Sequence, residues 1–178
     1  MKLHPVHGPR ARAEEALRRS SALVGAETTT FPRDSQGAPA PIRTHMGQWF
    51  WSLANTGNVA AAIVAPAPVG IDVEHLDRPR VAPLEAFADD KERRLLGTDD
   101  PERRLALWTG KEAVLKKAGC GLAELSACRL VEPPEEEALT FAHRGRRHRV
   151  LSFVRDRFLF AVACDADGFS LAPEEVAP

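Results

Sequence analysis

The chain has 178 residues, of which 44% are hydrophobic and 28% charged, as is ordinary for a folded globular protein. Its 24 Lys and Arg nearly balance its 25 Asp and Glu, so no overall charge bias favours nucleic acid or a membrane surface as a partner. No apolar run reaches the roughly 20 residues of a membrane-spanning helix. The N-terminus lacks the apolar segment of a signal peptide, and Cys120, Cys128 and Cys164 lack zinc-ligand spacing. Both features favour a cytoplasmic location with reduced cysteines.

The N-terminal part of the chain predicts one helix followed by a hairpin. Residues 10–24 combine good helix formers with an apolar stripe, so they predict a helix. Residues 26–47 are rich in Thr, Pro and Gly and predict turns with little regular structure. Short strands are expected at 49–53 and 59–64, with the hairpin turn at 55–57.

The remaining part of the chain alternates strands and helices. A strand is expected at 69–74, and helical spacing continues over 84–96. Asp100 and Pro101 are typical of a helix start, and that helix runs to Ala118 before a glycine. Further strands are expected at 126–131, 138–142, 147–154 and 157–164, with a turn at 155–156. The pattern predicts an α+β protein with about three helices.

Two acidic residues alternate with apolar ones in the segment 70–74. Side chains of a strand point alternately to opposite faces, so Asp72 and Glu74 share one face while Ile71 and Val73 point into the core. A hard cation that takes oxygen ligands would remove the repulsion between the two carboxylates. The plainer interpretation, two solvated acids on an exposed strand, stays open for this segment alone.

A second group of polar residues lies in the predicted helix at 108–116. Glu112 and Lys116 are four residues apart, hence neighbours on one face, and Trp108 precedes them by one turn. A Glu–Lys pair at this spacing is also a common surface stabiliser worth about 0.3 kcal/mol. The helix alone therefore does not identify a site.

Together and in this order, the two segments resemble the signature pair of Sfp-type phosphopantetheinyl transferases. That pair is a Gly-Ile-Asp-x-Glu strand followed by a helix with Trp-x-x-Lys-Glu-Ala-x-x-Lys. Upstream, residues 52–57 (Ser-Leu-Ala-Asn-Thr-Gly) stand where the family has a Ser-Leu-Ser-His-Ser/Thr-Gly hairpin, and residues 37–39 (Gly-Ala-Pro) stand where it has Gly-Lys-Pro. The resemblance covers about residues 10–131.

This resemblance implies a fold and a division of the chain. The expected fold is α+β, a pseudo-dimer of two small α/β lobes, each a short antiparallel sheet packed with a helix. We expect an N-terminal lobe at 1–68, a C-terminal lobe with the metal and catalytic residues at 69–165, and a flexible tail at 166–178.

The resemblance also implies a reaction and the roles of individual residues. Members of the family move the phosphopantetheine arm of coenzyme A onto a serine of an acyl or peptidyl carrier protein and release 3′,5′-ADP. Carried over to this chain, Asp72, Glu74 and Glu112 would bind Mg²⁺. Glu112 would also act as the base for the carrier serine. Lys116 would stabilise the leaving oxygen, and Lys111 would contact phosphate.

The chain departs from the family where relatives bind the 3′-phosphate of coenzyme A. Ala38 replaces the lysine of Gly-Lys-Pro, and Ala54 and Asn55 replace Ser-His. Each lost charge-assisted hydrogen bond is worth about 1.5–3 kcal/mol. Asn55 and Thr56 remain candidate donor-binding residues, and Arg43 is a candidate replacement cation. A donor without that phosphate, such as dephospho-coenzyme A, is therefore one expectation.

Two further interpretations stay open. The chain could be a catalytically diverged relative that binds carrier proteins or pantetheine compounds as a chaperone or regulator, or another Mg²⁺-dependent phosphotransferase or phosphohydrolase. Carrier proteins present an acidic helix, so a basic, partly apolar patch is the expected complement. The candidate residues for that patch are Arg78, Arg80, Phe87, Lys91, Arg93, Arg94 and Leu95.

Overall fold

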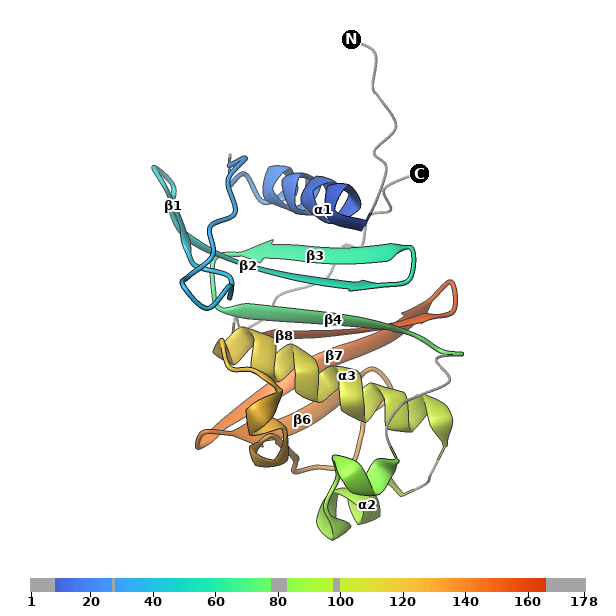
Figure 1. Cartoon of the computed structure of the whole chain (residues 1–178). Helices are drawn as coiled ribbons and strands as arrows, with labels where there is room; N and C mark the ends of the chain where they lie inside the picture. Colours follow the sequence, from blue (N-terminus) through green and yellow to red (C-terminus); the bar gives the residue numbers. More distant parts are fainter. Residues whose placement is uncertain (1–8, 27, 78–82, 98–99, 166–178) are drawn as a thin grey trace.

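The computed structural model describes residues 9–26, 28–77, 83–97 and 100–165 (Figure 1). Its elements in chain order are α1 (Pro9–Leu23), β1 (Ile42–Thr44), β2 (Gly47–Thr56), β3 (Val59–Ala65), β4 (Val69–His75), the 3₁₀ helix η1 (Leu84–Ala86), α2 (Asp90–Leu96), α3 (Pro101–Ala118), the 3₁₀ helix η2 (Leu122–Ala127), β5 (Arg129–Leu130), β6 (Ala138–His143), β7 (Arg146–Arg155) and β8 (Phe158–Cys164). Mixed helices and strands confirm the predicted α+β class.

The strands form two antiparallel sheets, each covered by a long helix. The first sheet has the order β1-β2-β3 and the second the order β4-β8-β7-β6-β5. In Figure 1, α1 lies along the β2–β3 hairpin, whereas α3 lies across β4, β8 and β7. Strand β4 runs beside β2, so the edge of the large sheet meets the small one. The division at residue 68 stays a prediction about domains.

The small sheet is held to α1 by a core of its own. Leu17 of α1 packs with Ile42, Trp51 and Val64, all at most 5% exposed. The Trp51 indole N–H donates to the carbonyl of Ala40 at 2.9 Å. That contact ties the segment before β1 to the sheet. The described residues before β1 form turns with little regular structure, as the composition predicted, whereas β1 itself was not expected.

Strand β4 is buried on both faces, and this burial places the acidic residues inside the protein. Ile71 and Val73 pack into the cluster shared with β2 and β3, as expected. On the other face α3 approaches so closely that a Cβ on Gly70 would lie 2.0 Å from the carbonyl oxygen of Ala113. Only glycine fits there, so the side chains that follow it on this face lie directly against α3.

Helix α3 begins and ends as its sequence predicted. The Asp100 side chain accepts a hydrogen bond from the backbone N–H of Arg103, and Pro101 occupies the first helical position. Gly119 ends the helix in the left-handed conformation, with φ of 66°. These caps fix which residues of the helix face β4.

Other predicted elements are corrected by the structure. The helix expected at 84–96 is interrupted, because Asp89 and Glu92 form a capping box that starts α2 separately from η1. The hairpin turns fall at 57–58 and 156–157, one or two residues later than expected. The strand expected at 126–131 is confined to β5, because η2 occupies the segment before it.

The tail expected to be flexible from residue 166 onward lies outside the described residues. Within the ranges that the structure describes, none of the helices combines the length and apolar character needed to span a lipid bilayer.

Candidate active site

The three carboxylates singled out in the sequence lie together between β4 and α3. Asp72 and Glu74 face α3 and are 4% and 7% exposed, and Glu112 is half-buried on the helix. One carboxylate oxygen from each residue lies within 4.8 Å of the other two. Residues forty positions apart thus meet because Gly70 and Ala113 let helix and strand approach closely.

Two neighbouring side chains hydrogen-bond to this cluster. Lys116, one turn after Glu112, places its Nζ 2.6 Å from Asp72 Oδ1. The Thr56 hydroxyl, at the end of β2, donates to Glu74 Oε2 at 3.3 Å. The small sheet therefore contributes one residue to a site that the large sheet and α3 otherwise form.

Three carboxylates and one ammonium give this group of side chains a net charge of −2 in their ordinary ionised forms. Like charges at such separations repel strongly where water is partly excluded. An all-oxygen donor set suits a hard divalent cation such as Mg²⁺, which usually takes one or two carboxylates and keeps several waters. The residues present therefore fit the metal that the resemblance implies.

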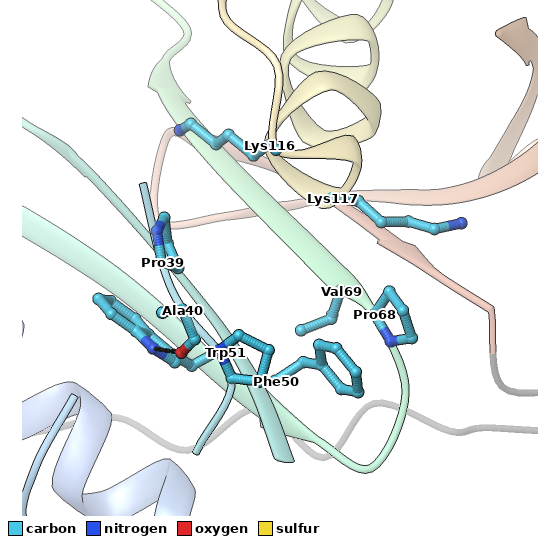
Figure 2. Close-up of a pocket in the computed structure, with 10 residues that line it drawn as sticks. Pro39, Ala40, Phe50, Trp51, Pro68, Val69, Lys116 and Lys117 are labelled. Atoms are coloured by element: carbon cyan, nitrogen blue, oxygen red, sulfur yellow. Dashed lines mark hydrogen bonds between the residues drawn. The ribbon is translucent and has the colours of Figure 1, made fainter. Parts of the chain in front are cut away.

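A small pocket of about 60 Å³ lies at the end of α3 and shares Lys116 with this cluster (Figure 2). Pro39, Phe50 and Trp51 line it from the small-sheet side, and Lys116 and Lys117 line it from the end of α3. Figure 2 shows the two lysine side chains leaving the helix in opposite directions. Lys116 thus reaches the acidic cluster while its stem forms a wall of the pocket. The pocket also adjoins the residues that resemble the family's Gly-Lys-Pro.

The structure does not bring Lys111 to this site. Its side chain is fully buried, and its Nζ lies 2.6 Å from the Phe87 carbonyl oxygen and 2.8 Å from Glu92 Oε1. Successive residues of a helix are rotated by about 100°, so Lys111 and Glu112 point to different neighbours. An ammonium enclosed in this way is not accessible to a phosphate, and the expected phosphate contact has no support from its position.

Asn55 and Arg43 are also separated from the carboxylates. Asn55 is exposed and shares a strand face with Trp51 and Leu53, which pack toward α1, whereas Thr56 lies on the opposite face. Arg43 pairs with Gln48 at the far end of β2, about 27 Å from Thr56 at 3.4 Å per residue. Of the three expected donor-binding residues in the small sheet, only Thr56 joins the cluster.

The candidate docking patch is only partly a surface. Phe87 is 5% exposed and packs edge-on against Trp108, with ring centroids 5.3 Å apart. Lys91 and Arg94 are exposed on α2, and Arg93 forms ion pairs with Asp90 and Glu85. Arg78 and Arg80 lie outside the described residues. The expected apolar centre of the patch is therefore part of the core.

Two residues, Ser52 of the matched hairpin segment and Glu92, have structural roles that the sequence analysis did not assign to them. The Ser52 hydroxyl accepts a hydrogen bond from the Ile71 backbone N–H at 3.0 Å, which holds β4 beside β2. Glu92 binds Lys111 and accepts a hydrogen bond from the Leu130 N–H at 2.7 Å. The Asp-x-x-Glu spacing at 89–92 was the one available signal for Glu92, because it is typical of a capping box.

Comparison with known proteins agrees with this geometry. Residues 68–163, just over half of the chain, match the family model of the 4′-phosphopantetheinyl transferase superfamily. The chain is also 30% identical over 94 residues to a 4′-phosphopantetheinyl transferase, psf-1, of Bacillus pumilus. That alignment covers 51% of this chain but only 40% of the relative. Both the acidic strand and α3 fall within the residues that match the family.

Proposed function

Because the chain belongs to the 4′-phosphopantetheinyl transferase superfamily, we propose that it transfers the phosphopantetheine arm of coenzyme A, or of a related donor, to a serine of an acyl or peptidyl carrier protein. The observation that carries this proposal is the meeting of Asp72, Glu74 and Glu112 around one point, with Lys116 against them. A domain that only binds a partner has no need of three carboxylates held together between a strand and a helix.

In this proposal Mg²⁺ is held by Asp72, Glu74 and Glu112. When bound, the ion would neutralise charge on the non-bridging oxygens of the donor's pyrophosphate. Asp72 and Glu74 supply oxygens from a rigid strand that is covered on both faces, so little reorganisation is needed to bind the ion. Thr56 orients Glu74 through the hydrogen bond from its hydroxyl.

Two residues of α3 would handle protons during the transfer. Glu112, less buried than Asp72 and Glu74, is the candidate base that takes the proton of the carrier serine as its oxygen bonds to phosphorus. The bond from that phosphorus to the bridging pyrophosphate oxygen breaks, and 3′,5′-ADP leaves. Lys116 is the candidate donor to the departing oxygen, since its side chain is 31% exposed and reaches from Asp72 to the pocket.

The pocket beside Lys116 is the candidate position for part of the donor nucleotide. Its wall at Pro39 and Ala40 follows Ala38, where relatives carry a lysine, and the neutral Asn55 stands where they carry a histidine. Neither residue therefore supplies a positive charge to a 3′-phosphate. This arrangement supports use of a donor that lacks that phosphate, or weak use of coenzyme A. It also keeps open the alternative of a diverged relative that binds carrier proteins or pantetheine compounds without catalysis.

The test is to incubate the protein with an apo carrier protein, Mg²⁺ and a donor, and to follow the mass of the intact carrier. We expect the carrier to gain one phosphopantetheine group, and we expect no gain when its acceptor serine is replaced by alanine. The Glu112→Gln variant is the matched control within this chain. Failure to modify any apo carrier would favour the non-catalytic alternative, which a binding measurement with the same carrier then tests.

Comparing coenzyme A with dephospho-coenzyme A in this assay tests the donor separately. We expect turnover of dephospho-coenzyme A to equal or exceed that of coenzyme A. A strong preference for the 3′-phosphorylated donor would contradict the idea that recognition of this phosphate has been lost.

A further inference from the structure

A second group of side chains lies at the end of α3, away from the carboxylate cluster. Cys120 follows the Gly119 cap of the helix, Glu124 is part of η2, and His143 is the last residue of β6. The Cys120 sulfur is 4.0 Å from His143 Nε2, and this nitrogen is 2.9 Å from Glu124 Oε2. All three ligand atoms lie within 4.8 Å of one another.

We propose that Cys120, Glu124 and His143 form a Zn²⁺ site. Zinc bonds of about 2.3 Å to sulfur and about 2.1 Å to nitrogen and oxygen place tetrahedral ligands about 3.4–3.6 Å apart. The observed separations of 2.9 and 4.0 Å lie on either side of these values. Shifts of about half an ångström would bring these two separations to the tetrahedral values, and side-chain rotation would adjust the Cys120–Glu124 separation, which is at most 4.8 Å.

The chemistry of the three ligands favours zinc over magnesium. Thiolate and imidazole are soft and borderline ligands that suit Zn²⁺, whereas Mg²⁺ prefers oxygen donors throughout. The thiolate would contribute one negative charge to the ion, while the Glu124 carboxylate is shared with the Arg144 guanidinium. On binding, the Cys120 thiol gives its proton to solvent and the sulfur bonds to the metal.

The surroundings also resemble those of a metal site. Arg144 donates from Nε to Glu124 Oε2 at 2.9 Å, and bound carboxylates commonly have such outer hydrogen-bond partners. The His143 side chain is 1% exposed, whereas that of Glu124 is 34% exposed, so the cluster is closed on the core side and open toward solvent. Three protein ligands leave the fourth position for water. The ion would join the end of α3 to β6, four residues beyond Lys116.

The proposal is tested on the whole chain after chelation, in metal-free buffer with a non-thiol reductant. Co²⁺ serves as the spectroscopic probe, because a thiolate ligand gives it a charge-transfer absorption. With excess Mg²⁺ present to occupy the carboxylate cluster, we expect one Co²⁺ per chain to give this absorption and one equivalent of Zn²⁺ to displace it. Native mass spectrometry gives the stoichiometry independently.

Variants separate this site from other ways of binding zinc. Cys120→Ser should abolish the absorption and weaken Zn²⁺ binding more than about 100-fold, the upper end of effects seen for outer partners. Arg144→Gln should weaken it roughly 10- to 100-fold. Cys164→Ser, a partly buried cysteine outside the cluster, and Glu112→Gln should both bind as the wild type does.

Several outcomes would overturn the proposal. One is a wild-type chain that shows no thiolate absorption with stoichiometric Co²⁺. Another is a Cys120→Ser variant, shown by circular dichroism to be folded, that binds Zn²⁺ as tightly as the wild type. Loss of Zn²⁺ binding in Glu112→Gln would assign the metal to the carboxylate cluster instead.

Discussion

Lys111 and Glu112 are neighbours in α3, yet they belong to two different kinds of ionic site. On the face toward α2, Lys111 pairs with a single carboxylate, Glu92, and both side chains are at most 3% exposed. On the face toward β4, Glu112 meets two further carboxylates and one ammonium, and Lys116 is 31% exposed. The Lys111–Glu92 pair is enclosed and balanced in charge, whereas the other face gathers three carboxylates close together beside the partly exposed Lys116.

This difference indicates which face can bind a ligand. A balanced buried pair has satisfied its charges internally, so it contributes to the fold and has nothing left to offer a substrate. Carboxylates held close together repel one another, and a bound cation relieves that repulsion. We therefore propose that Lys111 stabilises the fold, whereas Glu112 and Lys116 take part in the reaction. The following predictions test these two roles.

The largest effect on stability is expected from Lys111→Met. This substitution leaves Glu92 charged in the core, and breaking one partner of a buried pair costs about 3–5 kcal/mol of unfolding free energy. Chemical denaturation monitored by circular dichroism measures it. Lys91→Met, on the exposed side of α2, is the matched control and should change stability by less than about 0.5 kcal/mol.

The double variant Lys111→Met/Glu92→Gln sharpens the same point. The single amide oxygen can accept from only one of the Leu130 and Asp89 N–H groups that the two carboxylate oxygens of Glu92 serve, but no unpaired charge remains. We therefore expect the double variant to be more stable than Lys111→Met alone. Equal stabilities would show that packing around the lysine stem, and not the ion pair, explains the loss.

Glu112→Gln should lower activity and leave stability almost unchanged, the opposite of Lys111→Met. Removing one metal ligand and the candidate base should lower transfer to a carrier protein roughly 100- to 1,000-fold, as for loss of one preorganised transition-state contact. The unfolding free energy should stay within about 1 kcal/mol of wild type, because this face is not a balanced buried pair. A variant that loses stability instead would place Glu112 with Lys111 among the structural residues.

Asp89→Ala should lower stability by a smaller amount, and it should leave transfer to the carrier protein unchanged because Asp89 lies on the Lys111–Glu92 side of α3. Asp89 caps α2 through a 2.9 Å hydrogen bond from the Glu92 N–H, and loss of such a cap costs about 1 kcal/mol. That hydrogen bond lowers the pKa of Asp89 below its ordinary value of 3.8. Ionised Asp89 therefore stabilises the folded state above about pH 4. This stabilisation is lost as the pH falls through the lowered pKa of Asp89. The unfolding free energies of the wild type and the variant, measured by chemical denaturation, should become equal in acid.

The smallest effect concerns a third environment on α3, that of Lys117. Burial and then the charge of Lys117, 2.8 Å from His148 Nδ1, lower the pKa of His148, and they outweigh a backbone hydrogen bond with His143 and the charge of Asp165, which raise it. The unfolded chain then binds the proton more readily, so folded stability should fall as the pH drops below about 6.5. Stability of His148→Gln should depend less on pH between 7 and 5. An identical pH profile for the two proteins would contradict this.

Local signals allowed much of the site to be predicted. The alternation at 70–74 placed Asp72 and Glu74 on one face, and the four-residue spacing placed Lys116 beside Glu112. Both follow from the fixed periods of strand and helix. The caps of α3 were likewise correct because Asp, Pro and Gly act on the adjacent backbone.

The partner of the Lys111 side chain could not be predicted from such local signals. Its partner Glu92 lies nineteen residues earlier, on a helix whose start depends on a capping box inside a stretch that reads as one longer helix. The cysteine spacing likewise suggested no zinc ligands, since Cys120, Glu124 and His143 come from a helix end, a 3₁₀ helix and a strand.

The sequence by itself determined the α+β class, the identity of the acidic residues and which of them share a face, because backbone periodicity and capping act over a few residues. Only the tertiary structure decided which faces meet. The close approach of α3 to β4 at Gly70, the enclosure of Lys111 and the separation of Asn55 from Thr56 depend on how distant segments pack together. Packing is a property of whole surfaces, and no single segment of the chain specifies it.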